Sequence, residues 1–150
     1  MTWDLADIAK FVLVTASPIS ELRGGIPLGI ALGLDPCFTF FAAIIVNTLI
    51  FFPIFFILRL FYDKFPFRIP LFGGYLDRLR GRGKPIVEKY GFWGLFLFVG
   101  VPLPFSGAYT GTILAWLVDV EWKRAFPAVG LGVVVAGVIV FLITLGVISI

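Results

Sequence analysis

The chain has no histidine and only one cysteine, Cys37, among its 150 residues. A disulfide within the chain is therefore excluded, and zinc or haem sites built from His and Cys lack their ligands. Charged residues are also scarce, at 14% against about a quarter in soluble domains. Hydrophobic residues make up 60%. This composition predicts an integral membrane protein without a metal or another cofactor.

Two of the four long apolar stretches are interrupted. Pro18 and Pro27 divide residues 11–34, and the segment 101–107 divides residues 90–118. The pieces are too short to cross about 30 Å of hydrocarbon at about 1.5 Å per helical residue. Each interrupted stretch therefore predicts a re-entrant hairpin.

The other two stretches, residues 37–58 and 126–150, carry no charge and are long enough to span a bilayer. The order of hairpin, span, basic segment, hairpin and span predicts two repeats, over residues 5–62 and 90–150. One full crossing per repeat inverts the second repeat relative to the first. We therefore expect an all-α integral membrane protein, a single domain over 1–150, built as an inverted repeat of a re-entrant hairpin plus a transmembrane helix.

Basic residues gather on one side of the predicted spans. Eight Lys or Arg lie in residues 59–89, and Lys123 and Arg124 add two, whereas the other side has only Lys10. Cytoplasmic loops carry such an excess. We therefore expect residues 63–89 to be cytoplasmic and the protein to be multi-pass.

The basic segment itself allows two interpretations. Residues 73–85 form either a solvated loop that sets the topology, which we favour, or a short interfacial helix. In the second case Leu76 and Leu79 would face lipid and the arginines would face anionic headgroups.

Glu21 and Arg23 place two charges inside the first interrupted stretch. A charge at the bilayer centre costs at least ~2.5 to 3.5 kcal/mol, so this pair predicts a functional site. Arg23, backed by the Gly24 and Gly25 backbone, would hold a phosphate or carboxylate. Glu21 would bind and release a proton that drives transport. The alternative is a structural ion pair that pins the hairpin.

The second interrupted stretch offers hydroxyls instead of charges, on Ser106, Tyr109 and Thr110. They would line a substrate path or satisfy the backbone groups that prolines leave without partners, and the sequence favours neither. Asn47, in the first predicted span, would hydrogen-bond to the hairpin loop or to a second subunit. Glycines at four-residue spacing, as at Gly25 and Gly29, favour close helix packing.

Residues 21–29 and 102–111 resemble the two signature stretches of the family called putative small multi-drug export proteins, and the resemblance covers about residues 17–140. That family is similar to the DedA and VTT membrane proteins, whose two re-entrant hairpins face each other and which are linked to lipid flipping or proton-dependent export. The resemblance implies a transporter of the plasma (inner) membrane. It also implies further residues at the hairpin tips, namely Pro27, Pro102, Pro104, Gly107 and Gly111. We expect Pro18 at the tip of the first hairpin as well.

We therefore expect a secondary transporter or lipid flippase that moves a small or lipidic anion, coupled to protons, between two facing hairpins. The alternatives are a non-transporting assembly or lipid-organising protein, and an exporter of cationic drugs. An enzyme is disfavoured because the predicted membrane segments hold no pair of carboxylates for acid–base catalysis.

The expected partners are membrane lipids, the small-molecule or lipid substrate and a second copy of the chain. Nucleic acid is not expected, because the basic residues are confined to one side. Two spans and two hairpins enclose a site only thinly, which favours a homodimer. Small residues of the last span would form its seam, namely Gly130, Gly132, Ala136 and Gly137.

Overall fold

A computed structural model describes residues 4–61, 70–102 and 106–148 of the chain. These residues form helices joined by short turns and include no strand. The helices are α1 (Leu5–Thr15), α2 (Glu21–Ala31), α3 (Pro36–Phe61), α4 (Pro70–Tyr90), α5 (Phe92–Gly100), α6 (Ala108–Leu117) and α7 (Trp122–Ile148). The prediction of an all-α protein is confirmed.

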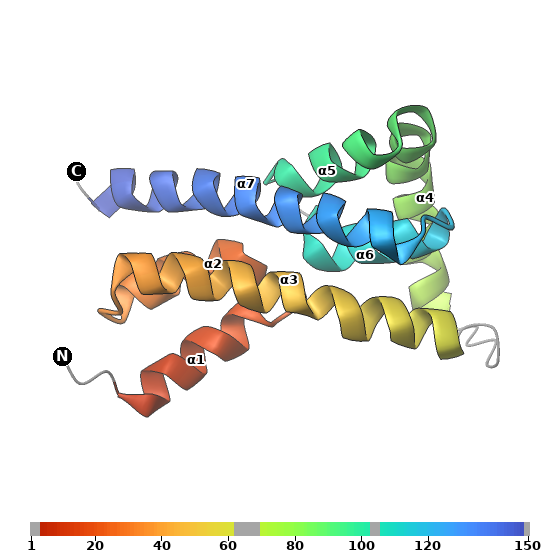
Figure 1. The fold of residues 1–150 in the computed structure, drawn as a ribbon. Helices are drawn as coiled ribbons and strands as arrows, with labels where there is room; N and C mark the ends of the chain where they lie inside the picture. The colour runs from red at the N-terminus through yellow and green to blue at the C-terminus, as the bar shows by residue number, and fades with distance from the viewer. Residues whose placement is uncertain (1–3, 62–69, 103–105, 149–150) are drawn as a thin grey trace.

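The two long helices, α3 and α7, form the centre of the bundle and run in opposite directions (Figure 1). Both are long and apolar enough to cross a membrane, with mean hydropathies of 2.6 and 2.9. At about 1.5 Å per residue, either helix exceeds the ~30 Å of a hydrocarbon core. The two predicted spans are thus confirmed as candidate spans, with starts a few residues earlier than expected. Pro53 and Pro127 lie inside these helices without ending them.

The short helices form two antiparallel pairs whose open ends lie at opposite ends of the molecule. The α1–α2 pair opens at the left of Figure 1, where α3 begins, and the α5–α6 pair opens at the right, where α7 begins. The helices break between Thr15 and Glu21 and between Gly100 and Ala108, within the two stretches that the prolines divide.

Both pairs end in the same kind of turn before the long helix that follows. Gly33 after α2 and Asp119 after α6 have positive φ values of 79° and 55°. The Leu34 N–H donates to the Gly29 carbonyl at 3.0 Å, and the Val120 N–H makes the matching bond at 2.9 Å. This is the Schellman arrangement, in which a left-handed residue lets the chain satisfy the last carbonyls of a helix.

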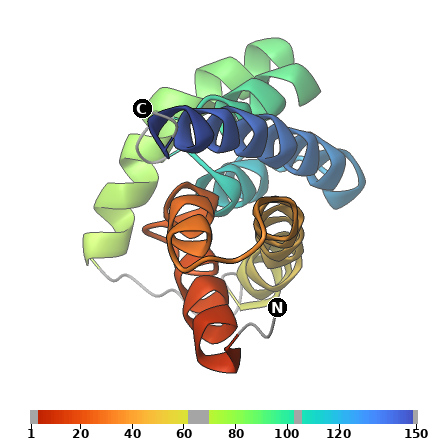
Figure 2. The ribbon, with the colours of Figure 1, turned by 90° about the vertical axis from the view of Figure 1, so that its left-hand side faces the viewer.

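Each pair reaches across to the long helix of the other half. α2 packs on α7 as well as on α3, and α6 packs on α3 as well as on α7. Viewed from the end, α6 occupies the middle of the bundle, between α3 and α7 (Figure 2). The halves differ in their first helix, because α5 packs along α7 whereas α1 splays away from α3 (Figure 1).

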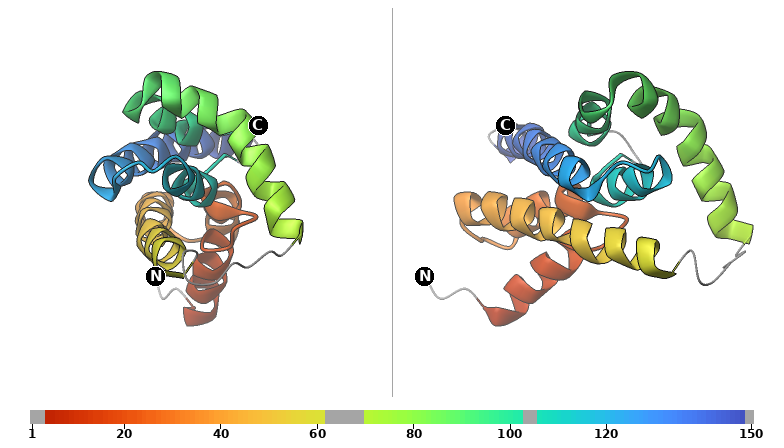
Figure 3. Two further views of the ribbon diagram at one scale, coloured as in Figure 1. Left: turned by 90° about the vertical axis from the view of Figure 1, so that its right-hand side faces the viewer. Right: turned by 45° about the vertical axis from the view of Figure 1, so that its right-hand side comes forward.

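The basic segment forms the helix α4, so the favoured interpretation as a solvated loop is wrong for the part from Pro70 onward. The expectation that Leu76 and Leu79 face lipid is also wrong, because both are buried. α4 lies along the outside of the bundle and packs on α5 and α6 (Figure 3), with Gly83 against Leu114 of α6. Burial of this apolar side against protein stabilises the helix.

The small residues of α7 are used inside the chain. Gly132 lies against Val99 of α5, and Gly137 lies against Ile44 of α3. Gly132, Ala136 and Gly137 are buried within the chain and are therefore not available to the predicted dimer seam, whereas Gly130 is half-buried near Thr48 of α3. Close approach of the helices within one chain explains their small size.

Candidate functional site

Glu21 begins α2 directly after the turn that joins α1 to α2. Its φ of 50° is in the left-handed region, which costs an ordinary residue roughly 1–2 kcal/mol. Its side chain is buried, at 8% exposure. A strained backbone at a buried charged residue is typical of a functional position.

The Glu21 carboxylate lies at the N-terminus of α6, in the other half of the molecule. Its Oε1 accepts from the Tyr109 N–H at 3.1 Å, and the Ala108 N–H also faces the carboxylate. Gly107, the residue before α6, has no side chain to serve as an N-cap, and a Cβ there would overlap the carboxylate. Glu21 therefore supplies from a distance the capping oxygen and the negative charge that a helix N-terminus favours.

Arg23 makes a second connection between the two halves. Its Nη2 donates to Ser106 Oγ at 3.1 Å, and Ser106 Oγ donates to the Val101 carbonyl at 2.6 Å. Val101 caps the C-terminal end of α5, where a helix leaves carbonyls without partners in the helix. Ser106 thus joins the Arg23 guanidinium to the end of α5.

Two further polar side chains satisfy the carbonyls at the end of α1. The Tyr109 hydroxyl donates to the Ala16 carbonyl, and Asn47 of α3 donates to the Thr15 carbonyl at 3.4 Å and to the Ala43 carbonyl at 3.0 Å. Thr15 is the last residue of α1, so Asn47 contacts the first helix pair directly beside the loop that was one of its two predicted partners. Within a membrane such partners are required, because lipid offers the backbone none.

Glu21 and Arg23 do not form a salt bridge with each other. Among the described residues the ion pairs within 4.0 Å are Lys10–Asp7 and Lys84–Glu88. Glu21 faces the α6 N-terminus and Arg23 faces Ser106. The two charges therefore form no direct ion pair with each other, although each still acts electrostatically on the other at longer range.

The other predicted site residues are Thr110, two glycines of α2 and the residues predicted at the hairpin tips. Thr110 bonds to its own turn, with Oγ1 accepting from the Gly107 N–H at 2.7 Å. Gly25 lies against Thr15 of α1, whereas Gly24 lies closest to Ser20 of the preceding turn, with Val14 of α1 next to it. These two glycines thus pack the first helix pair together.

Of the predicted tip residues, Pro18 lies in the α1–α2 turn, Pro102 in the segment after α5 and Gly107 directly before α6. Pro27 and Gly111 lie inside α2 and α6, so their placement at the tips is wrong. A proline ring inside a helix removes only one backbone hydrogen bond, and α2 continues past it. Pro104 is outside the described residues.

Tyr75 of α4 is a neighbour of the site that the sequence does not reveal. Burial, and then the nearby Glu21 carboxylate, raise the pKa of its phenol. The signal for this proximity is the apolar pattern of α4, in which Leu76, Leu79 and Val87 recur on one side at helical spacing and are buried. That pattern predicts a helix whose apolar side packs on the rest of the protein. Tyr75, next to Leu76, would then lie close to that apolar side.

Two cavities, of about 440 Å³ and 450 Å³, lie around the α6–α7 turn, and Glu21 and Arg23 line neither of them. Among the described residues, no three His, Cys, Asp or Glu side chains gather as metal ligands would. The chemistry that the site offers is thus one carboxylate, one guanidinium, hydroxyls and the N–H groups that begin α6.

Two long apolar helices around a buried carboxylate and a half-buried guanidinium define a helical membrane protein. The chain belongs to the family described as putative small multi-drug export protein, whose model matches residues 21–139. The match begins at Glu21 and includes both halves of the site. No curated protein and no solved structure matches the chain. The family description agrees with membrane transport as the function.

Proposed function

We propose that the protein is a secondary transporter or lipid flippase whose two helix pairs are re-entrant hairpins of an inverted repeat. The antiparallel course of α3 and α7, the matching turns at Gly33 and Asp119, and the exchange of contacts between the halves support this arrangement. When the two halves are aligned on the equivalent turn residues Gly33 and Asp119, Gly25 corresponds to Gly111 and Glu21 corresponds to Gly107. In such folds substrate sites lie where the broken segments meet, near the bilayer midplane.

Arg23 is the group that binds the substrate, which is a small or lipidic anion. A guanidinium presents several N–H donors to phosphate or carboxylate oxygens, and its charge is permanent. It is half-buried beside Ser106, where the two helix pairs meet. Its connection to the second pair through Ser106 is the observation that carries this proposal, because an anion that takes the guanidinium would loosen that connection.

The Glu21 carboxylate occupies, in this structure, the position at the start of α6 that a substrate anion would take. It occupies the N–H groups and the positive end of the α6 dipole, which would otherwise attract a substrate anion. Protonation would remove the negative charge and weaken this contact, so the helix pairs would separate and the anion would take its place. Proton binding and anion binding at one helix end would thus be coupled.

The basic residues also support an orientation. Arg59 at the end of α3, the helix α4, and Lys123 and Arg124 at the start of α7 lie at the right-hand end of Figure 1. This end would be cytoplasmic and the opposite end, with both termini, would face outward. A homodimer remains part of the proposal, through a surface other than the covered face of α7.

Thermal unfolding of the purified protein tests the assignment of Arg23, because a ligand that binds the folded state raises its stability. The panel comprises inorganic phosphate, phosphatidylglycerol in mixed micelles and the cationic dye ethidium, applied to wild type, Arg23→Ala and Arg23→Lys. Arg78→Ala, which removes an exposed arginine of α4, is the matched control. We expect an anion to stabilise wild type and the control, to act weakly on Arg23→Lys and to leave Arg23→Ala unchanged.

Flux across vesicles then separates transport from binding. The anion that stabilises the protein should cross a membrane containing wild type and not one containing Arg23→Ala. Equal stabilisation of wild type and Arg23→Ala by anions would overturn the role of Arg23. If ethidium stabilises wild type and Arg23→Ala equally, the result favours an exporter of cationic drugs. If an anion binds but does not cross the membrane, the result favours the lipid-organising alternative.

A further inference from the structure

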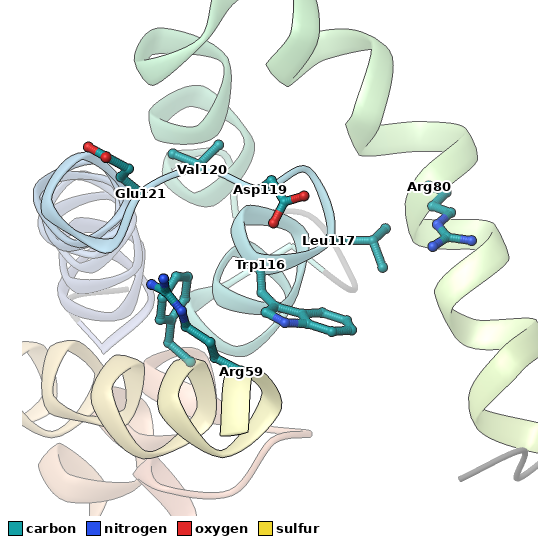
Figure 4. Close-up of a pocket in the computed structure, with 8 residues that line it drawn as sticks. Arg59, Arg80, Trp116, Leu117, Asp119, Val120 and Glu121 are labelled. Atoms are coloured by element: carbon teal, nitrogen blue, oxygen red, sulfur yellow. The ribbon is translucent and has the colours of Figure 1, made fainter. Parts of the chain in front are cut away.

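A polar cavity lies at the basic end of the molecule, away from Glu21 and Arg23. It has a volume of about 440 Å³ and lies between the end of α3, the middle of α4 and the α6–α7 turn (Figure 4). A neighbouring cavity of about 450 Å³ shares Asp119, Val120 and Glu121 with it, so one cleft continues around the turn. The residues that give the first cavity its chemistry are Phe55, Arg59, Arg80, Trp116, Asp119 and Glu121.

The cavity wall holds two cations and two anions. Arg59 rises from α3, Arg80 projects from α4 on the other side, and Asp119 lies between them on the turn (Figure 4). Among the described residues, none of these side chains, nor Glu121, forms an ion pair within 4.0 Å. All four are exposed, so they are available to a ligand.

The position of the cavity suits a membrane surface. Phe55 and Arg59 belong to the last two turns of the candidate span α3, where the apolar helix meets its basic end. Trp116 lines the same cavity with an apolar ring and a polar N–H, and tryptophan is favoured at the boundary between hydrocarbon and headgroups. A ligand here meets an apolar wall on one side and charges on the other.

We propose that this cleft binds a phosphate group that carries an amine, as in a phosphoethanolamine headgroup. Arg59 and Arg80 would hold the phosphate oxygens by charge-assisted hydrogen bonds. Asp119, with Glu121, would accept from the ammonium group. A purely anionic headgroup satisfies the two arginines but places its charge beside the Asp119 carboxylate, so the mixed lining selects the zwitterion.

This site is independent of the proposed transport site, because the two share no residue. Its ligand comes either from the bilayer, as phosphatidylethanolamine, or from solution, as free phosphoethanolamine. The chemistry of recognition is the same in both cases. The experiment therefore includes both sources.

Three variants isolate the charges. Arg59→Gln combined with Arg80→Gln removes both cations while keeping side chains of similar shape. Asp119→Asn removes one carboxylate and keeps a residue that tolerates the positive φ of 55° at this position. Arg82→Gln is the matched control, since Arg82 is an exposed α4 residue that lines neither cavity.

The measurement is the apparent Kd from thermal unfolding of the full-length protein titrated with phosphatidylethanolamine or phosphatidylglycerol in mixed micelles, or with soluble phosphoethanolamine. All proteins carry Arg23→Ala, so that phosphatidylglycerol bound at the transport site does not contribute. In this background we expect the protein with an intact cleft and the Arg82→Gln control to prefer phosphatidylethanolamine. The double arginine variant should bind it about tenfold more weakly or worse. Asp119→Asn should lose the preference and bind phosphatidylglycerol as tightly.

Stabilisation by soluble phosphoethanolamine equal to that by the lipid supports the site and identifies a soluble ligand, whereas stabilisation by the lipid alone identifies a membrane headgroup. Equal binding of the two lipids by Arg23→Ala, or unchanged binding of phosphatidylethanolamine when both arginines of the cleft are replaced in that background, overturns the proposal. Neither result bears on Arg23, so the transport proposal stands or falls separately.

Discussion

Glu21 and Gly107 are complementary: the carboxylate of Glu21 occupies the space that a side chain on Gly107 would fill. The contact joins the first residue of α2 to the residue that precedes α6. An N-terminal residue of a helix usually provides its own capping oxygen. Here the oxygen comes from the other half of the chain, so one carboxylate both caps the start of α6 and joins the two halves.

A double-mutant cycle tests this relationship. Gly107→Ala should lower the thermal unfolding midpoint strongly, because the new methyl group displaces the carboxylate from the Tyr109 N–H. In a Glu21→Ala background the same change should cost much less, since the space is then empty. The difference between the two costs is the interaction free energy of neighbouring sites, about 0.5–3 kcal/mol.

Gly81→Ala on α4 is the control for this cycle, because a Cβ there meets nothing within 4 Å. It should be neutral or slightly stabilising, as alanine is in an exposed helix. Equal costs of Gly107→Ala with and without the Glu21 carboxylate would contradict the capping arrangement.

Removal of the Glu21 charge should also remove a pH dependence. At acidic pH the protonated side chain no longer places a negative charge at the α6 N-terminus, so wild type should bind its anion more tightly than at alkaline pH. Glu21→Gln should bind with similar affinity at both, because Arg23 keeps its charge throughout. The measurement is the anion Kd from thermal unfolding at the two pH values. A Glu21→Gln protein that keeps the wild-type pH dependence would assign the proton to another group.

Helix packing in the second half allows a test by size compensation. A Cβ at Gly111 of α6 would overlap Cγ2 of Val99 on α5, while the nearest other atoms of Val99 and Val129 are 3.7 Å away. Gly111→Ala should therefore destabilise the protein, and Val99→Ala in addition should restore much of the loss by removing the overlapping methyl group. Thermal unfolding of the two single variants and the pair measures this. Additive losses in the pair would show that the two helices do not approach as described.

The single cysteine tests the orientation. Cys37 is exposed near the start of α3, at the end of the molecule opposite α4. In intact cells a membrane-impermeant maleimide should label wild type. It should not label the variant Cys37→Ser with Gly81→Cys, whose thiol lies on α4, until the cells are opened. The reverse pattern would invert the topology, and labelling of both would show that α4 and Cys37 lie on the same side.

Several features follow from short segments of sequence. The two long apolar runs are helices of sufficient length to span, and the interruptions separate α1 from α2 and α5 from α6. Asp35 caps α3 through its bond to the Phe38 N–H at 2.9 Å, as expected of an acidic residue before a proline. These are local properties, because apolar length, proline and capping residues act within a few positions.

Other local inferences were wrong because packing altered their outcome. Pro27 lies inside α2, since the loss of one hydrogen bond does not end a helix that is buried on its neighbours. The basic segment was predicted as a loop from its charges, yet α4 is a helix with Leu79 in the core. Charge density alone could not show that one side of this segment would find a protein surface.

The sequence by itself determined that this is a helical membrane protein with charges at a helix break, because composition and apolar length set the cost of leaving lipid. Only the tertiary structure decided what those charges contact. Glu21 and Tyr109 are 88 positions apart, and no local pattern reveals that a glycine in one half leaves room for a carboxylate from the other. The partner of a buried charge depends on which segments folding brings together. In this protein the packing of α2 and α6 against both long helices brings Glu21 to the start of α6.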